Sequence, residues 1–282
     1  MKEKCVHLIC KDHLVSGEKF QIETTSIEGV LKTVPVPDKT RIDHYYQSEL
    51  YISHTDSKDN FIDSIYQKVK KFAIKSKYQT ILKNKPDTKK LLDIGSGTGD
   101  FLKAAKHYNI SSVGTEPNEQ ARKLSKEKGN IVVENLEDIR EEKFDAITLW
   151  HVLEHVYEPS LYLDKINKLL DHNGILLIAV PNYNSFDAHY YRAHWAAYDV
   201  PRHIWHFSRE GMKKILEEHN FKILKYQSLP FDSFYVSLLS EQYKNGRKNL
   251  MKAFFIGLRS NLKAIKTKEH SSILYIAKKI TK

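Results

Sequence analysis

The chain has 282 residues, 41% of them hydrophobic and 28% charged, with a mean hydropathy of −0.52. This balance argues against a largely disordered chain, and no apolar run has the length of a transmembrane helix or the pattern of a secretory signal. The two cysteines, Cys5 and Cys10, lie together near one end. The chain is therefore predicted to fold without disulfides in a reducing cytoplasm.

The net charge of +10 is concentrated near the end of the chain. From Lys244 onward there are eleven Lys and Arg residues and one acid, Glu269, whereas the remaining 243 residues hold 34 bases and 34 acids. A nucleic-acid-binding protein usually spreads its basic residues along a face or stripe, so nucleic acid is not an expected partner. The basic tail indicates a local electrostatic role or a solvated surface.

The first part of the chain reads as an extension of the main domain. Residues 18–25 alternate between polar and apolar, stop at a turn and resume at 30–36, which predicts a β-hairpin. A tyrosine-rich segment follows at 44–54. Apolar spacing then predicts a helix over 60–82, which Pro86 closes.

From Lys89 onward, short apolar runs alternate with helical patterns. The predicted strands are 91–95, 112–116, 130–134, 145–150, 174–181, 221–227 and 273–279, and the predicted helices are 100–107, 118–128, 159–170 and 209–219. This alternation is typical of a doubly wound α/β fold with a mostly parallel sheet, here of seven strands. Two longer connections, 182–208 and about 231–270, interrupt the pattern, and long connections often carry function.

These patterns predict four parts along the chain. They are a hairpin and tyrosine-rich lid at 1–57, a linking helix at 58–88, a core at 89–230 that contains the 182–208 insert, and a basic helical insert with the final strand at 231–282.

The first βα connection of the core, residues 93–99, reads D-I-G-S-G-T-G. Glycines permit positive φ and let the backbone approach a ligand, whose polar groups meet free N–H donors at the helix start. In a dinucleotide-binding fingerprint a third small residue follows the second glycine by three positions, where this chain has Asp100. Because the Asp100 carboxylate would repel a pyrophosphate, the loop favours a ligand without phosphates at this point.

This loop resembles motif I of the class I S-adenosylmethionine methyltransferases, and the resemblance extends over about 89–227. It implies a Rossmann-like methyltransferase fold with S-adenosylmethionine as cofactor. It also implies that Glu116 binds both ribose hydroxyls and that residues 134–139 contact the adenine. The positions it assigns to the cofactor are Asp93, Gly95, Ser96, Gly97, Gly99, Glu116, Pro117, Asn135, Leu136, Trp150 and His151.

Structural roles are alternatives at several of these positions. Asp93 can cap the turn through backbone hydrogen bonds, and Glu116 can be a solvated strand end. Trp150 follows a strand, where an aromatic residue usually belongs to the core. Asn135 stands where the family often has Asp, although an amide also suits hydrogen bonding to adenine.

Residues 151–155 read H-V-L-E-H, which matches an inverted zinc-protease motif. Two His residues four apart in a helix can hold zinc, but this stretch directly follows a predicted strand, and the first βα loop already indicates another cofactor. No metal is therefore predicted. The resemblance instead places His151 near the sulfonium, with Glu154 and His155 on the next turn, where a packed His155 is the alternative.

The 182–208 insert is expected to carry the acceptor site, because ligands of doubly wound sheets bind outside the carboxyl ends of the strands. Within it, D-V-P-R-H at 199–203, followed by H-F-S at 206–208, resembles a motif of a bacterial methyltransferase subfamily. Ser208 is expected to cap the helix that begins at Arg209.

Methyl transfer from a sulfonium depends mainly on positioning, and a hydroxyl acceptor also needs a base near neutral pH. His151 or His203 is predicted to be this base, and Asp199 orients it or is an alternative base. Arg202 is predicted to anchor an anionic acceptor. Alternatively, Asp199 and Arg202 form a salt bridge that fixes the loop.

The N-terminal segment resembles the region that precedes the core in the same subfamily, where paired C-x-x-C motifs form a small zinc site. Residues 45–51 keep that region's Y-Y-x-S-E-x-Y stretch, which implies that Tyr45 and Tyr46 lie near the cofactor, although they can also be a packing strip. The cysteines are five residues apart and no second pair follows. Zinc is not expected here, although four residues form a conceivable set, Cys5, His7, Cys10 and His13.

The basic tail has the pattern of an amphipathic helix over 247–266. Its apolar residues from Met251 to Ile265 fall on one stripe, and basic residues lie along one flank. Two interpretations follow: contact with an anionic membrane or a lipid-linked acceptor, or a stripe that packs on the core beneath a solvated face. The predicted location is accordingly cytoplasmic, with peripheral contact at the inner membrane surface under the first interpretation.

These features predict an S-adenosylmethionine-dependent methyltransferase that acts at oxygen on a small-molecule or lipid-linked acceptor. One alternative is a cofactor-binding or membrane-docked protein without turnover. Another is a nicotinamide-dependent oxidoreductase, against which the missing third glycine and the lack of a second catalytic domain count. No oligomeric state is predicted.

Overall fold

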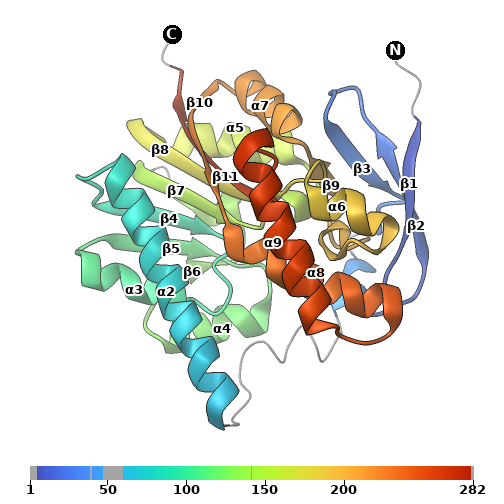
Figure 1. The fold of residues 1–282 in the computed structure, drawn as a ribbon. Coiled ribbons are helices and arrows are strands. Elements are labelled where there is room, and N and C mark those ends of the chain that lie inside the picture. Colours follow the sequence, from blue (N-terminus) through green and yellow to red (C-terminus); the bar gives the residue numbers. More distant parts are fainter. Residues whose placement is uncertain (1–4, 39, 47–59, 141, 281–282) are drawn as a thin grey trace.

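The centre of the molecule is a seven-stranded sheet (Figure 1). A computed structural model describes residues 5–38, 40–46, 60–140 and 142–280, and in it the strand order is β10-β11-β8-β7-β4-β5-β6. The strands are β4 (Lys90–Ile94), β5 (Ser111–Thr115), β6 (Ile131–Val133), β7 (Phe144–Trp150), β8 (Leu170–Pro181), β10 (Phe221–Ser228) and β11 (Ser272–Lys279). Strands β4 to β8 pair in parallel and β11 runs antiparallel to both its neighbours, which confirms the predicted sheet.

Consecutive apolar residues give this sheet two buried faces, because neighbouring side chains of a strand point to opposite sides. Leu91 packs in a cluster with side chains of α2 (Asn60–Asn84) and α3 (Asp100–Ala104). Leu92 belongs to the opposite cluster, with α5 (Pro159–Leu169) and α7 (Arg209–Glu218). Helix α4 (Glu119–Glu127) connects β5 to β6. Single 3₁₀ turns follow α3, β6 and β7, at Ala105–Tyr108, Leu136–Asp138 and Leu153–His155.

The strand order reverses at β4, because the chain passes to β5 on one side and later returns to β7 on the other. A crevice at the carboxyl ends of the strands is the usual ligand site at such a point. The glycine loop follows β4 and His151 follows β7, so both lie at this edge of the sheet. Ser208 accepts the N–H of Gly211 and caps α7, as predicted.

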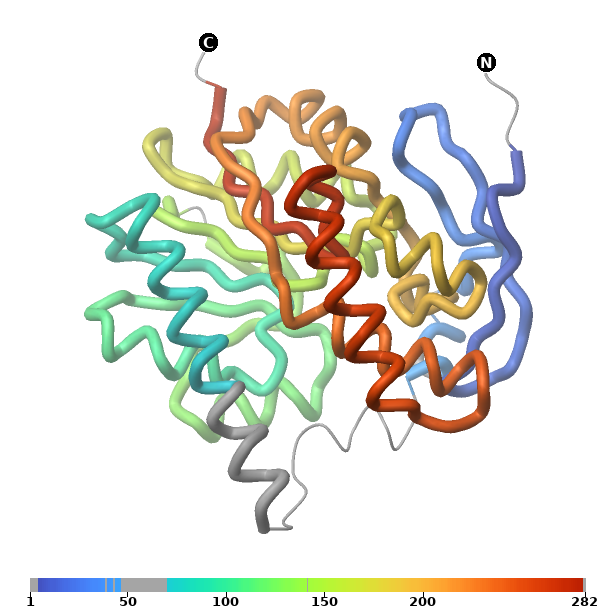
Figure 2. Tube along the Cα trace, viewed as in Figure 1, coloured from blue at the N-terminus to red at the C-terminus, as the bar shows by residue number. Residues whose placement is uncertain are grey.

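A second sheet joins the N-terminal extension to the 182–208 insert, and the sequence did not predict it. Its order is β1 (Val6–Lys11), β2 (Lys19–Thr24), β3 (Val30–Val34) and β9 (Trp205–Phe207). The predicted hairpin is the β2–β3 pair. Strand β9 comes from the 182–208 insert and pairs with β3, so the insert and the N-terminal extension form one structural unit (Figure 2).

A separate hydrophobic cluster holds this unit together. It combines Phe20, Ile22 and Leu31 of the N-terminal strands with Trp195 and Tyr198 of the insert. Within the insert, α6 (Phe186–Tyr191) and the 3₁₀ turns Arg192–His194 and Ala196–Tyr198 contribute side chains to this cluster. The 3₁₀ turn Ile42–Tyr46 of the N-terminal extension does so as well.

Two helices precede the last strand, and the second of them is the amphipathic helix that the sequence predicted over 247–266. They are α8 (Pro230–Asn245) and α9 (Leu250–Thr267), and they pack against each other across the front of the molecule in Figure 1. In the described part of the chain, none of the helices has both the length and the apolar composition needed to span a bilayer.

Candidate functional site

The glycine loop after β4 leaves room for a ligand at its middle glycine. Gly95, Gly97 and Gly99 all have positive φ, between 54° and 79°. A Cβ on Gly95 would meet Val152 at 2.4 Å, and one on Gly99 would meet Ser125 at 2.0 Å, whereas a Cβ on Gly97 would find no atom of the described residues within 4 Å. The outer two glycines are therefore required by packing, and the middle one borders open space.

Glu116 holds this loop from the end of the neighbouring strand. Its Oε2 accepts the N–H of Gly97 at 2.8 Å, and its Oε1 accepts the N–H of Asn118 at 2.9 Å. The side chain is nearly buried, and burial raises the pKa of Glu116 against these two hydrogen bonds. Glu116 is thus no solvated strand end, and each carboxylate oxygen keeps a lone pair for a ligand hydroxyl.

Asp93 forms part of the buried floor beneath the loop. It accepts a hydrogen bond from Thr148 of β7 at 2.6 Å, and burial raises the pKa of Asp93 to about 7. Lys77 of α2 lies above this floor, with its Nζ 4.3 Å from the ring centroid of Trp150. Two buried polar atoms here, Ser96 Oγ and Trp150 Nε1, have no hydrogen-bond partner among the residues that the structure describes. Such groups fit contact with a polar ligand.

The third predicted contact segment follows β6. Asn135 is exposed and its N–H donates to Asp138, so its side chain remains accessible. Leu136 is fully buried in the main core, so only its backbone can face a cofactor. Pro117 is exposed, and its carbonyl accepts a hydrogen bond from Arg122, which also reaches Glu134.

Asp100 does not present the free negative charge that the sequence analysis assumed. Its carboxylate forms salt bridges with Lys70 and with Lys128, the latter at 2.8 Å. These two lysines offset much of the repulsion expected toward a pyrophosphate. The spacing of the glycines, rather than this charge, distinguishes the loop from a dinucleotide-binding one.

His151 lies between two carboxylates at the carboxyl end of β7. Its Nε2 is 3.1 Å from Asp232 of α8, and its Nδ1 is 3.4 Å from Glu154. Burial alone would lower its pKa, but these carboxylates raise the pKa of His151 to about 10. The imidazole is therefore protonated at neutral pH and has no lone pair to accept a proton.

A second group of ionisable side chains, next to His151, is formed by Glu154, His155 and His203. One ligand atom of each lies within 4.8 Å of the others, and the two imidazole rings meet edge to face with centroids 4.5 Å apart. Glu154 is 1% exposed, and within the part of the chain that the structure describes its carboxylate oxygens make no hydrogen bond of regular geometry beyond the ion pair with His151. Burial would raise the pKa of Glu154, but His151 and His203 hold it below its usual value.

Backbone carbonyls set the orientation of both imidazoles in this group. The carbonyl of Ala197 lies 2.9 Å from Nδ1 of His203, and that of Arg202 lies 3.0 Å from Nδ1 of His155. A carbonyl only accepts, so Nδ1 carries the hydrogen and Nε2 of a neutral ring keeps its lone pair. Burial and the neighbouring His203 lower the pKa of His155 to about 4, so His155 is neutral at physiological pH.

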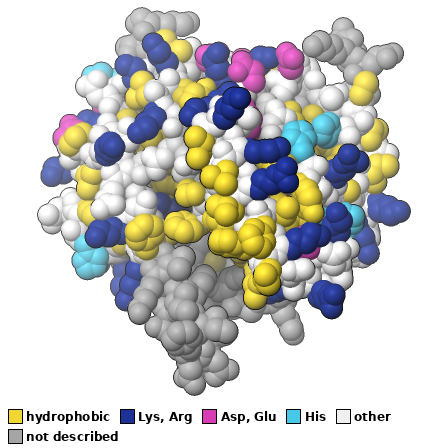
Figure 3. All heavy atoms as spheres, in the orientation of Figure 1, with side chains coloured by type: hydrophobic (Ala, Val, Ile, Leu, Met, Phe, Trp, Pro, Cys, Tyr) yellow, Lys and Arg dark blue, Asp and Glu magenta, His cyan; other side chains and the backbone are white. Residues whose placement is uncertain are grey.

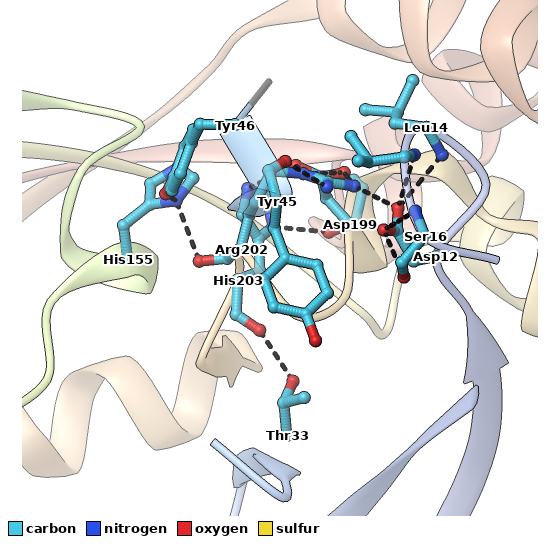
Figure 4. A network of polar contacts seen from close by, with 12 residues as sticks. Asp12, Leu14, Ser16, Thr33, Tyr45, Tyr46, His155, Asp199, Arg202 and His203 are labelled. Carbon is cyan, nitrogen blue, oxygen red and sulfur yellow. Dashed lines mark hydrogen bonds and ion pairs between the residues drawn. The ribbon is translucent and has the colours of Figure 1, made fainter. Parts of the chain in front are cut away.

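Arg202 cannot anchor an acceptor, which corrects the expectation from the sequence. It is 1% exposed and binds Asp199 through Nε and Nη2, Asp12 through Nη2 at 2.8 Å, and the carbonyl of Tyr45 through Nη1 (Figure 4). Burial would lower the pKa of Arg202, but the two carboxylates raise it. The alternative interpretation, a salt bridge that fixes the loop, is the observed one.

The same network includes Asp199 and connects the insert to the turn between β1 and β2. Asp199 gives both oxygens to Arg202, and its Oδ2 lies 4.0 Å from Nε2 of His203. Asp12, between β1 and β2, also accepts N–H groups of Leu14 and Ser16. Asp199 is therefore paired with Arg202 and is no free base.

The two tyrosines of the predicted lid point in different directions. Tyr45 is buried in the N-terminal cluster, and its hydroxyl donates to Glu18, away from the glycine loop. The Tyr46 hydroxyl lies 3.2 Å from Nδ1 of His155, so Tyr46 reaches the histidine group (Figure 4). The rest of the lid, from residue 47, is outside the described residues.

The donor set that can hold a metal differs from both sets considered in the sequence. Residues 151–155 do not form an α-helix, and His151 turns toward Asp232 rather than sharing a face with His155. Among the described residues, the grouping with suitable ligand spacing is Glu154, His155 and His203, donors that a zinc ion accepts. The conceivable N-terminal set is not such a grouping, with Cys10 buried and Cys5 exposed.

Sequence reasoning missed four residues of this site. Asp232 and Lys77 come from helices that only the tertiary fold brings to the edge of the sheet, and Asp12 lies 190 positions from its partner Arg202. For the fourth, Glu154, the resemblance gave a place on the turn after His151, but its burial and its neighbours were not predicted. Its position between apolar Leu153 and a histidine, directly after a buried strand, was the available signal that it is buried.

The comparisons with known proteins agree with this geometry. The family model of the methyltransferase domain matches residues 59–226. A ubiquinone biosynthesis O-methyltransferase from Actinobacillus pleuropneumoniae serotype 5b is 33% identical over 108 residues, which are 33% of this chain and 46% of that protein. One from Nitrobacter winogradskyi is 30% identical over 146 residues, 44% of this chain and 56% of that protein. The chain thus spans about half the length of these curated relatives.

Solved structures share the fold at low sequence identity. Magnesium protoporphyrin IX methyltransferase from Synechocystis PCC 6803 has a TM-score of 0.55 at 14% identity, covering 85% of this chain and 99% of that one. A SAM-dependent methyltransferase from Archaeoglobus fulgidus has a TM-score of 0.51 at 20% identity, covering 78% and 100%. The fold is the Rossmann-like fold expected from the sequence, and with the family match over more than half of its length the chain belongs to the methyltransferase domain family.

Proposed function

We propose that this protein is an S-adenosylmethionine-dependent methyltransferase that methylates an oxygen atom of a small-molecule or lipid-linked acceptor. Membership of the methyltransferase domain family supports the reaction class. The curated relatives are named as O-methyltransferases of ubiquinone biosynthesis, which supports oxygen as the methylated atom and a phenolic acceptor. One structural observation supports the cofactor most directly: the open space at Gly97 beside the Glu116 carboxylate.

The residues at the edge of the sheet suit the parts of this cofactor. Glu116 is placed to accept hydrogen bonds from two ribose hydroxyls, and the unpaired Ser96 Oγ and Trp150 Nε1 offer polar contacts. The accessible amide of Asn135 is the group proposed to recognise adenine. When bound, S-adenosylmethionine supplies an electrophilic methyl group on a positively charged sulfur.

The protein's own contribution is to hold the acceptor and take its proton. We assign the base to Nε2 of His203, because Ala197 fixes its tautomer and the ring is nearly buried. His151 is excluded from this role by its two carboxylate partners, and serves as a fixed positive charge. Nε2 of His203 would take the proton of the acceptor hydroxyl, and the buried Glu154 carboxylate would stabilise the imidazolium. The methyl group would pass to the acceptor oxygen as its bond to sulfur breaks, which leaves S-adenosylhomocysteine.

The region beside His203 is the proposed acceptor site. It is surrounded by aromatic and small side chains of the insert and of the end of β8, including Trp195, Trp205, Tyr183 and Pro181, and these pack so closely that a phenol enters only when they move apart. Aromatic and apolar walls beside a histidine are typical of sites for planar organic substrates. This lining fits a phenol better than a strongly anionic acceptor, since Arg202 is already fully paired.

Calorimetric titration tests the cofactor assignment. S-adenosylhomocysteine is expected to bind and NAD is not, and Glu116→Ala is expected to weaken binding at least tenfold. Glu119→Ala, an exposed change on the first turn of α4, is the matched control and should bind normally. Tight binding of NAD, or unchanged binding by Glu116→Ala, would contradict the assignment.

Mass spectrometry of a phenol panel incubated with S-adenosylmethionine tests turnover and its site. A product heavier by one methylene whose phenol no longer titrates supports O-methylation. A product methylated at carbon or nitrogen would refute the choice of oxygen while keeping the reaction class. Adding EDTA to the same assay shows whether a metal at Glu154, His155 and His203 contributes.

A further inference from the structure

Helix α9 carries its small residues inward and its large apolar residues outward. The buried side consists mainly of Ala253, Gly257, Ser260 and Ala264, which recur at helical spacing. A Cβ on Gly257 would come within 2.8 Å of Phe234 of α8, and the Ser260 hydroxyl donates to the buried Asp187. The small face therefore fixes the helix closely against the protein, so its orientation is set by packing.

The opposite side of the same helix is apolar and solvent-exposed. We call it the α9 apolar face, and its residues are Met251, Phe254, Phe255, Leu258, Leu262 and Ile265. These side chains are between 36% and 73% exposed. Figure 3 shows hydrophobic side chains gathered over α8 and α9 on this side of the molecule. Soluble domains rarely leave such a contiguous patch uncovered, so the face is expected to meet a partner.

The apolar surface continues from α9 onto neighbouring helices. Phe231 at the start of α8 is 63% exposed. Its ring packs edge to face against that of the exposed Phe72 of α2, with the ring centroids 6.2 Å apart. Asn261 of α9 donates to the carbonyl of Pro230, which joins the two helices at this point. Helix α9 alone is about 27 Å long at 1.5 Å per residue, so the patch is long and convex rather than a closed pocket.

Positive charge lines one side of this face. From Lys244 to Lys268 the chain has eight Lys and Arg residues and no acid. The basic flank of α9 consists of Lys252, Arg259, Lys263 and Lys266, and Lys248 lies just before the helix. Some of these cations lie over rings of α6: Lys263 and Arg259 over Phe186, and Lys252 over Tyr190. Lys252 also pairs with the buried Glu241, whereas Arg259 and Lys263 have no such ion pair among the described residues.

We propose that the α9 apolar face and its basic flank dock the protein on an anionic lipid bilayer. An amphipathic helix with large apolar residues on one side and cations along its edge inserts in the plane of the interface, where anionic headgroups meet the cations. A second copy of the chain is a poorer occupant, because a symmetric contact would bring two basic flanks together. The positive charge of the basic flank thus favours an anionic surface, and the long convex shape of the α9 apolar face suits a bilayer.

Docking of this face would bring the methyltransferase site close to the lipid. Phe231 belongs to the exposed surface, and the next residue, Asp232, pairs with His151. A lipid-soluble acceptor in the bilayer would then lie near the carboxyl edge of the sheet. This consequence rests on the proposed function, whereas the docking itself does not.

Co-sedimentation with vesicles tests the docking. The full-length protein is expected to sediment with vesicles of 30% phosphatidylglycerol in phosphatidylcholine at about 0.1 M salt, to bind pure phosphatidylcholine far less, and to be released as salt rises. The apolar double variant Phe254→Ser/Phe255→Ser is expected to lose this binding. The charge variant Arg259→Glu/Lys263→Glu/Lys266→Glu should bind at least about 100-fold more weakly, since each cation near an anionic surface contributes roughly fivefold.

Matched controls change equally exposed residues elsewhere. Leu161→Ser on α5 and the pair Lys103→Glu/Lys126→Glu should bind as the unaltered protein does. Thermal unfolding and S-adenosylhomocysteine binding of every variant show that the fold and the cofactor site persist, which separates failure of docking from failure of the proposed function. Equal binding to neutral and anionic vesicles, no binding to either, or unaltered binding by the α9 variants would overturn the proposal. A dimer in light scattering that Phe254→Ser/Phe255→Ser dissociates would also overturn it in favour of a second copy.

Discussion

At the residue scale, two glycines with positive φ allow the effect of a side chain on cofactor binding to be distinguished from its effect on backbone strain. Gly97 has a φ of 54° and Gly246 a φ of 71°, and a Cβ on either meets no atom within 4 Å. Gly97→Ala is expected to weaken S-adenosylhomocysteine binding at least tenfold, because the new methyl group enters the space proposed for the cofactor. Isothermal titration calorimetry measures this directly.

Gly246→Ala is the control for backbone strain. Gly246 caps the C-terminus of α8, far from the glycine loop in sequence. Both substitutions place a Cβ on a residue in the left-handed region, which costs about 1–2 kcal/mol of unfolding free energy. The two variants should therefore unfold at similarly reduced denaturant concentrations, while only Gly97→Ala loses affinity. Equal affinity in both variants would mean that the open space at Gly97 is not the cofactor site.

The choice of His203 over His151 as base gives a second residue-scale prediction. His203→Asn is expected to lower kcat by about 10²–10⁴ while leaving S-adenosylhomocysteine affinity unchanged, because it removes the lone pair that takes the acceptor proton. His151→Asn should lower turnover far less, because it leaves that lone pair of His203 in place. Rates of both variants from pH 6 to 9 decide between them, and a His203→Asn enzyme with full activity would contradict the assignment.

The neutral His155 predicts an acid-sensitive fold. Its pKa falls from 6.5 to about 4 in the folded protein, so between these values the unfolded chain binds more protons. Stability is therefore expected to be lost as the pH falls from 6.5 toward 4. Urea midpoints at pH 7 and pH 4.5 should differ less in His155→Asn than in the unaltered protein. His172→Asn, an exposed change, should leave the difference as it was.

At the scale of secondary-structure elements, the Arg202 network fixes the insert to the first turn of the chain. Arg202→Met is expected to cost about 3–5 kcal/mol of unfolding free energy, because it leaves the buried Asp12 and Asp199 carboxylates without their shared cation. Arg209→Met removes a partly exposed pair with Glu269 and should cost less than about 1 kcal/mol. Chemical denaturation compares them, and equal losses would show that the buried network adds no stability.

The elements also show which parts of the structure a sequence can predict. The seven main strands were predictable because their apolar runs are buried on both faces, and α7 because Ser208 supplies a cap. Strand β9 has three residues and exists only through pairing with β3, some 170 positions away, so no local pattern marks it. Similarly, the periodicity of α9 predicted an apolar stripe, but only the small residues of the opposite side show that the stripe faces outward.

In the candidate site too, residues specified by a local motif were predictable, whereas residues whose partners lie far away in the sequence were not. The glycine loop and Glu116 were predictable because a local motif specifies them. Arg202 was assigned wrongly, because two of its three partners, Asp12 and the carbonyl of Tyr45, come from the other end of the chain. Nothing within the insert shows that the guanidinium is already neutralised.

At the scale of the whole molecule, the site lies between two hydrophobic clusters that can be perturbed separately. The cofactor loop rests on the main sheet, whereas His203 belongs to the unit built from the N-terminal strands and the insert. Local stability differs among such units, and a core truncation acts mainly on the cluster that contains it. The proposed cofactor and acceptor functions should therefore respond to different core mutations.

Ile22→Ala and Ile81→Ala make this comparison, since both side chains are fully buried, one in each cluster. Each is expected to cost about 2–5 kcal/mol. Ile22→Ala should accelerate hydrogen exchange in β3 and β9 and lower kcat, because the strand next to His203 loosens, while S-adenosylhomocysteine affinity stays within about twofold. Ile81→Ala should instead accelerate exchange in α2 and β4 and weaken that affinity. If Ile22→Ala released the cofactor as readily as Ile81→Ala, the two clusters would form a single cooperative unit and the separation of cofactor and acceptor functions would be lost.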